Sequence, residues 1–169
     1  MADLGVKHYM VHQYGNTSIT PFEIEKWIDI EQKYEGLKYI SAKGLFDKGK
    51  PKNRYTEVFA DSDKLRVWVG EEICREATEI DFTFAFVGED RLNTLDDFYN
   101  FLSCKGKVDD NVKTVDYWDN IRKKWAKMVL LDEFTTKEEK WLGSTPYIEL
   151  SVKMQNIYGE CETYPPVTE

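Results

Sequence analysis

The stretch that decides the fold is "TEIDFTFAFVGED", residues 78–90. Its large apolar residues fall on every second position, namely Ile80, Phe82, Phe84 and Phe86. A period of two places all four side chains on one face of an extended strand. We therefore expect a central strand over 77–87, with this face in the core and a Gly-Glu-Asp turn directly after it.

A single amphipathic helix is predicted to follow this strand. Its apolar positions have helical spacing and comprise Leu95, Phe98, Tyr99 and Leu102. Thr94 and Asp97 form a capping pair, and Gly106 is a typical residue at the end of a helix. We expect the helix at about 94–104, with Thr94 as its N-cap, covering an open edge or end of the β-structure.

Shorter patterns predict the remaining elements. Alternating apolar residues indicate strands at 64–69, 124–134 and 146–157. "YMVHQYGNTSIT" (9–20) indicates a hairpin with its turn at Gly15-Asn16. The segment 20–35 begins with a capping pair that is typical of a helix, but its apolar residues fall mostly on alternate positions, as in a strand. We favour the strand. Segments 44–54 and 107–114 are predicted to be a loop and an acidic turn.

These elements predict a mainly β (α+β) fold, an antiparallel β-sandwich with one flanking helix at about 94–104. For 169 residues we expect a single domain over 1–169, with a flexible N-terminal segment at about 1–7 and a C-terminal arm at about 160–169. The predicted core comprises Ile80, Phe82, Phe84, Phe86, Leu95, Phe98, Leu102, Ile148, Leu150 and Val152.

Composition argues against several functional classes. The net charge of −8 disfavours a protein that neutralises nucleic-acid phosphates. No apolar run approaches the ~18 residues of a membrane span, and the N-terminus has no signal-peptide core. Three cysteines, Cys74, Cys104 and Cys161, lack metal-ligand or redox spacing, so we expect reduced thiols and synthesis in a cytoplasm.

The sequence offers little chemistry. His8 and His12 are four residues apart without an obvious third ligand, so we expect neither a metal nor another cofactor. The acid-rich segments "EIEKWIDIE" (23–31) and "VDDNVKTVDYWD" (108–119) could supply paired carboxylates to a small hydrolase, but solvated faces are the favoured interpretation. No catalytic residue is predicted.

Charge and aromatic patterns suggest contacts with other proteins. Two basic clusters, Lys43–Arg54 and Arg122–Lys127, are either solvated faces or complements to acidic surface, such as 108–116 or the tail 159–169 of another copy, or the surface of a neighbouring protein. Contact with nucleic-acid phosphates is a third and weaker interpretation. Tyr117, Trp118 and Trp141 are predicted to lie in turns, where aromatic residues are typical of interfaces. The predicted subunit-interface residues are Lys48, Lys50, Lys52, Arg54, Asp109, Asp110, Tyr117, Trp118, Arg122 and Lys123.

The order of these elements resembles a family, the small tail proteins of long-tailed bacteriophages and prophages (the tail-tube and distal-tail, tube-to-baseplate group). The resemblance covers about residues 8–159 and includes "YMVHQYGNT", "REATEIDFTFAFVGEDRLNTLDDFYNFL" and "TPYIELSVKMQNIYG". It implies a virion structural protein of the phage tail, made in the bacterial host cytoplasm, whose copies form hexameric rings or tubes with each other and with neighbouring tail proteins. It also implies no catalysis, no membrane contact and no specific nucleic-acid binding, although DNA could pass through a lumen.

One alternative function is of a different class. A β-sandwich binding module could recognise carbohydrate, peptide or another protein through Trp68, Tyr117, Trp118 and Trp141. That interpretation requires these rings to form a concave cluster on a single copy of the chain.

Overall fold

The computed structural model describes residues 6–14, 18–50, 54–58, 65–69, 75–104, 112–131, 135–136 and 138–164. For 54–58, 65–69, 112–113 and 135–136 only the backbone is described. In chain order the elements are β1 (His8–Tyr14), η1 (Ile24–Lys26), β2 (Ile28–Asp29), α1 (Ile30–Lys33), β3 (Leu37–Lys43), β4 (Arg54–Val58), β5 (Leu65–Val69), β6 (Thr78–Val87), α2 (Arg91–Leu102), β7 (Val112–Asp119), β8 (Lys124–Leu130), β9 (Thr135–Thr136), β10 (Lys140–Leu142), β11 (Thr145–Asn156) and β12 (Glu162–Thr163).

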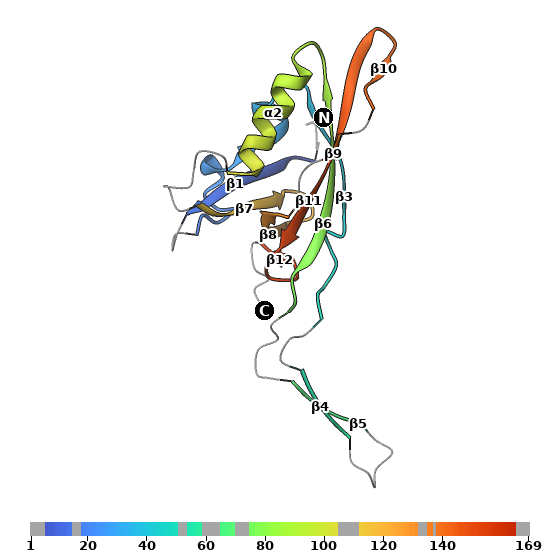
Figure 1. Ribbon diagram of the computed structural model, residues 1–169. Coiled ribbons are helices and arrows are strands. Elements are labelled where there is room, and N and C mark those ends of the chain that lie inside the picture. The colour runs from blue at the N-terminus through green and yellow to red at the C-terminus, as the bar shows by residue number, and fades with distance from the viewer. Residues whose placement is uncertain are drawn as a thin grey trace.

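The sandwich is made from one antiparallel sheet that folds over itself. Its strand order is β2-β1-β7-β8-β11-β6-β3. β11 pairs with β6 over the whole of Tyr147–Asn156, but with β8 only over Met154–Asn156. The sheet therefore turns at this short β8–β11 corner. As a result, β1, β7 and β8 form one layer whose strands run across β11, β6 and β3 in the other layer (Figure 1). The predicted mainly β sandwich with one flanking helix is confirmed.

The core lies between these two layers and is rich in aromatic rings. Phe82 and Phe84 stack with their ring centroids 5.7 Å apart on β6. Phe82 also meets Tyr117 of β7 at 5.3 Å, which joins one layer to the other. All ten residues predicted for the core are buried, and β6 is a central strand between β11 and β3. The period of two in 78–87 thus corresponds to one buried face.

The long helix begins and ends earlier than the sequence predicts. α2 spans Arg91–Leu102, its N-cap is Asp90, and the Thr94 amide already donates to the Asp90 carbonyl within the helix, so the prediction of Thr94 as N-cap is wrong. The reason is Gly88, whose φ of 106° lets the chain reverse directly after β6. The helix ends before Cys104, which adopts a φ of 56°, whereas Gly106 lies outside the described residues.

α2 closes one end of the sandwich, as the apolar stripe predicts. The ring of Phe98 packs edge-on to Phe84 of β6 at 4.9 Å. One turn later, Phe101 stacks on His12 of β1 at 4.3 Å. Because β6 and β1 belong to different layers, the helix covers the opening between them (Figure 1).

The favoured strand over 20–35 is wrong except at β2. The rest of the segment contains the short helices η1 and α1. Trp27 explains the difference: its indole is buried and its Nε1 donates to the Thr20 carbonyl at 2.9 Å, which draws the segment into a compact turn. Phe22, one of the alternating apolar residues that favoured a strand, is instead 71% exposed.

Of the predicted N-terminal hairpin, the first strand forms as β1, and the turn at Gly15-Asn16 lies outside the described residues. β1 pairs with β2 and β7, and residues 18–20 are not a strand. The side chain of Gln13 replaces the backbone pairing, because its Oε1 accepts from the Ile19 amide at 2.7 Å and its Nε2 donates to the Ile19 carbonyl at 2.8 Å.

The segment 107–114 is predicted to be an acidic turn, but its last residues already belong to a strand. β7 begins at Val112 and includes Tyr117 and Trp118, which are therefore not in a turn. Val115 and Tyr117 face the core, and Asp116 between them is also buried, so this strand lacks the solvent-facing polar side that simple alternation predicts.

Both ends of the described chain are held against the sandwich. The Lys7 amide donates to Asn120 Oδ1 at 2.9 Å. In the predicted C-terminal arm, β12 pairs with β8, and the residues after Tyr164 lie outside the described chain. Within the described residues, no helix is long and apolar enough to cross a membrane.

Candidate assembly surfaces

A two-stranded arm extends from the sandwich. β4 and β5 pair from Arg54↔Val69 to Val58↔Leu65 and form a sheet separate from the large one. Figure 1 shows this arm (β4 with β5) extending far beyond β6 and β3, from whose ends the chain enters and leaves it. The sequence predicts a loop at the start of the arm, but Arg54 is already in β4.

Three backbone segments meet at the root of the arm. The Gly49 amide donates to the Gly159 carbonyl at 2.8 Å, and the Glu76 amide donates to the Lys50 carbonyl at 2.8 Å. A Cβ at Gly49 would lie 1.8 Å from the Glu76 carbonyl oxygen, and a Cβ at Gly159 would lie 2.2 Å from the same atom. Only glycine permits this approach at both positions. The outgoing chain, the returning chain and the C-terminal segment are therefore locked together where the arm begins.

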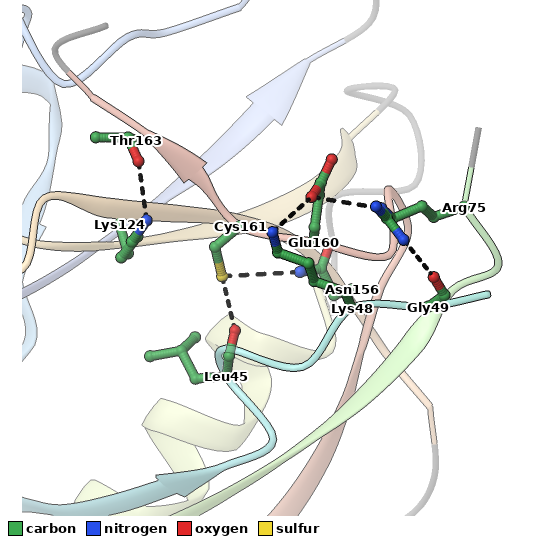
Figure 2. Close-up of polar contacts among 9 residues, drawn as sticks. All are labelled: Leu45, Lys48, Gly49, Arg75, Lys124, Asn156, Glu160, Cys161 and Thr163. Carbon is green, nitrogen blue, oxygen red and sulfur yellow. Dashed lines mark hydrogen bonds and ion pairs between the residues drawn. The ribbon is translucent and has the colours of Figure 1, made fainter. Parts of the chain in front are cut away.

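Side chains reinforce this root (Figure 2). Arg75 Nη1 donates to the Gly49 carbonyl at 2.9 Å, and its Nε lies 3.5 Å from a carboxylate oxygen of Glu160. The thiol of Cys161 donates to the Leu45 carbonyl at 2.9 Å, and its burial raises its pKa to about 11, so the thiol stays protonated at neutral pH. These contacts fasten residues 159–161 to the segment that leads into the arm.

Several predicted interface charges are already paired within the chain. Glu160 lies 4.0 Å from Lys48, Asp119 lies 3.3 Å from Arg122, and Glu162 lies 3.7 Å from Lys127. The sequence predicts the basic clusters and the acidic tail as complements between copies, whereas the structure brings them together within one chain. In the pairs of Glu160 with Lys48 and of Glu162 with Lys127, both side chains are at least partly exposed, so each of these two pairs contributes little to stability, roughly 0–1 kcal/mol.

Lys50 and Lys123 are exposed. Lys123 has a φ of 53° in the turn between β7 and β8. Lys52, Asp109 and Asp110 lie outside the described residues.

The aromatic residues do not gather on one face. Tyr117 is fully buried and its hydroxyl lies 2.6 Å from His8 Nδ1, so its predicted role at a subunit interface is wrong. Trp118 is half-buried beside Tyr9, and Trp141 is on β10. The side chain of Trp68 lies outside the described part of the chain. The ring cluster required for a binding module is therefore not formed by Tyr117, Trp118 and Trp141.

The acids and histidines with predicted alternative roles have structural contacts. Asp116 is buried and accepts from Thr114 Oγ1 at 2.6 Å, from Trp125 Nε1 at 2.8 Å and from Gln13 Nε2 at 3.2 Å. Its burial raises the pKa of the carboxyl group, and these three hydrogen bonds oppose that shift. His12 Nε2 is bonded to the Phe101 carbonyl at 2.8 Å. Among the described residues, no three metal-ligating side chains cluster.

A second projecting feature is the hairpin of β10 and β11. Its turn contains Gly143, with a φ of 63°, and its strand β10 carries Trp141 (65% exposed) and Leu142 (76% exposed). Arg91 of α2 forms an ion pair with Glu139, which ties the helix start to this hairpin. A hollow of about 550 Å³ lies between them and is lined by Gly88, Glu89, Arg91, Trp141, Ser144, Thr145 and Pro146. We call Trp141, Leu142 and this hollow the tip.

An apolar and basic patch lies near the other end of β6. Phe46 is 52% exposed, Ile121 is 50% exposed, and the Arg122 guanidinium lies 5.7 Å from the centroid of the Phe46 ring. The turn that presents Ile121 is ordered by Asp119 Oδ1, which accepts from the Ile121 amide at 2.8 Å and from the Arg122 amide at 3.0 Å. We call Phe46, Ile121, Arg122 and Lys123 the patch. Sequence reasoning missed its two apolar members, because an isolated apolar residue in a turn has no period.

No protein-family model and no curated protein matches the sequence. Among solved structures, the chain is similar to a chain in the structure of the phage P2 baseplate in its activated conformation with Ca. The TM-score is 0.46 at 12% sequence identity, and the match covers 88% of this chain and 44% of that chain. The chain thus spans less than half of the length of the protein it matches.

Proposed function

We propose that this protein is a structural subunit of a long-tailed phage or prophage tail, of the tail-tube or distal-tail group. Its copies assemble into rings or tubes with each other and with neighbouring tail proteins in the virion. The subunit performs no catalysis and binds no cofactor, and it contributes shape and contact surface. The resemblance in the order of elements over residues 8–159 supports this assignment.

The arm is the observation that carries the proposal. Its strands pair with each other, and its root is fixed by the contacts between Gly49, Gly159 and Glu76. Holding an extended hairpin in one direction costs conformational entropy. That cost is offset if the arm forms a contact with another molecule, and subunits of rings and tubes make such contacts repeatedly.

The net charge supports the same role. A subunit surface of net charge −8 disfavours adhesion to DNA phosphates, which suits a protein that surrounds a DNA channel. Like charge also opposes association of the copies at low salt, so assembly requires specific contacts that bring opposite charges or apolar groups together.

An arm-less variant tests the proposal. Lys50 and Glu76 are joined by a hydrogen bond, so residues 51–74 can be replaced with a short glycine-serine linker without separating the two ends. We expect this variant to unfold at a temperature close to that of the full-length chain but to assemble only at higher concentrations than the full-length chain. Sedimentation velocity and negative-stain images report the assembly.

A remote charge reversal is the matched control. Glu25→Lys changes an exposed residue of η1 and leaves the arm intact, so its assembly should equal that of the wild-type chain. If the arm-less variant assembles as readily as this control, the arm is not an assembly element and the proposed function loses its principal support.

A further inference from the structure

We infer that the tip of one copy docks on the patch of the next copy, in a head-to-tail contact between opposite ends of the sandwich. The inference rests on the proposed function, since it names the surfaces through which two copies meet. The partner is therefore a second copy of this chain.

The tip is apolar at its centre and mainly acidic around it. Trp141 and Leu142 are the two most exposed large apolar residues of this hairpin, and Leu92 at the start of α2 is 55% exposed. Exposed acids nearby are Glu89 and Asp90 of the β6–α2 turn and Glu138 before β10, while Lys140 is an exposed cation of the same hairpin. Arg91, the cation in the hollow, is already paired with Glu139.

The patch has the complementary character. Phe46 and Ile121 provide exposed apolar surface, and Arg122 and Lys123 provide positive charge beside it. Asp119, which pairs with Arg122, is itself fully buried, so the exposed part of this ion pair is the cation. In the docked pair, the exposed ring and aliphatic side chain of the patch lie in the hollow of the tip, and a lysine of the patch faces a glutamate at the rim of the tip. An apolar centre with a charged rim is the usual anatomy of an interface.

The two surfaces of one copy cannot meet each other. The pairing of β6 with β11 runs from Val87↔Tyr147, beside the tip, to Thr78↔Asn156, beside the arm root. The patch is at the second end, because Gly44 approaches the Glu79 carbonyl and Leu45 contacts Cys161. Ten paired residues at ~3.3 Å each separate these ends by about 30 Å. Because these complementary surfaces lie so far apart on one rigid copy, they can pair only between two copies.

Such a contact is heterologous, and this property gives a sharp test. After two copies dock, the pair retains one free tip and one free patch, so association continues into a ring or a filament. A variant without a working tip still has its patch, and a variant without a working patch still has its tip. Mixing the two should therefore give a 1:1 dimer that cannot grow further through these two surfaces.

The tip variant is Trp141→Ser with Leu142→Ser, and the patch variant is Phe46→Ser with Ile121→Asp. All four side chains are at least half-exposed, so thermal unfolding should change little. In sedimentation velocity, we expect each variant alone to associate at least about tenfold more weakly than the wild type, as for the loss of central contact residues. An equimolar mixture should sediment as a dimer of the two variants.

Charge reversal provides an independent readout. Glu89→Lys and Lys123→Glu should each weaken association, whereas the chain carrying both should recover it, because the opposite charges again face each other between copies. Glu25→Lys is the control.

Three results would overturn the inference. If either double variant assembles like the wild type, the tip and the patch are not contact surfaces, while the proposed function stands. If both variants are monomeric but their mixture forms no dimer, the two surfaces do not bind each other. If wild-type chains stay monomeric at every concentration, the self-assembly in the proposed function fails together with this contact.

Discussion

Gly49→Ala tests most directly whether the close backbone contact at the arm root stabilises the protein. The new methyl group would lie 1.8 Å from the Glu76 carbonyl oxygen and 2.8 Å from its carbonyl carbon, and both atoms belong to the backbone. An ordinary contact of this kind is about 3.5 Å, so the two segments must separate by well over 1 Å. The separation strains the hydrogen bonds from Gly49 to Gly159 and from Glu76 to Lys50. We expect a loss of about 2–3 kcal/mol in the free energy of unfolding, the range for forced overpacking.

Gly143→Ala is the matched control for Gly49→Ala. Gly143 has a φ of 63°, and a Cβ at this position would meet no atom within 4 Å, so alanine there costs only the left-handed backbone conformation, roughly 1–2 kcal/mol. Urea unfolding gives both free energies, and hydrogen exchange of the Gly49 and Glu76 amides shows whether the root has opened. If Gly49→Ala costs less than about 0.5 kcal/mol and leaves both amides protected, the close approach at the root does not hold the arm.

Three further predictions concern the sandwich itself. Phe84→Ala should lower the free energy of unfolding by ~3–5 kcal/mol, since the ring is fully buried, and a loss below ~1 kcal/mol in urea unfolding would contradict its place in the core. Asp116→Ala should cost roughly 2–4 kcal/mol because three buried donors lose their acceptor, whereas Asp116→Asn, which keeps one carbonyl oxygen, should cost less. Burial lowers the pKa of His8 below 6.5, so stability should fall as the pH drops through 6.5, where the unfolded chain takes up a proton that the folded chain excludes. This dependence should be weaker in His8→Phe, and an unchanged pH profile of unfolding would refute the assignment to His8.

The sequence predicts the parts of the fold in which one face of an element is uniformly apolar. Ile80 to Phe86 and Ile148 to Val152 alternate without interruption, and both segments are strands at the predicted positions. Phe98 and Leu102 likewise indicate the buried side of α2. In these places local pattern and tertiary burial agree, so the period alone is sufficient.

The departures occur where a polar or distant group determines the local structure. Asp116 is as buried as its neighbour Tyr117, so the strand β7 does not have the polar face that alternation requires. Its carboxylate oxygens accept hydrogen bonds from Gln13, which is 103 residues away in the sequence, and from Trp125 on the next strand. Trp27 similarly bends the segment before β2 by a contact that no period reveals.

The candidate surfaces were predictable only in part. The basic clusters and the acidic tail are recognisable as complementary in the sequence, but only the tertiary structure places Glu160 beside Lys48 in the same subunit. The glycine contacts of the arm root join Gly49 to Gly159, more than a hundred residues apart, and glycine alone carries no signal for such an approach.

The most direct test of the central claim is the mass of the purified full-length chain in solution, measured by sedimentation velocity over a range of concentrations and salt and paired with negative-stain images. A subunit of a tail ring or tube should form species well above the monomer mass of 19.9 kDa, increase in size with concentration, and appear as closed rings or tubes. A single species of 19.9 kDa at every concentration and salt would contradict the account.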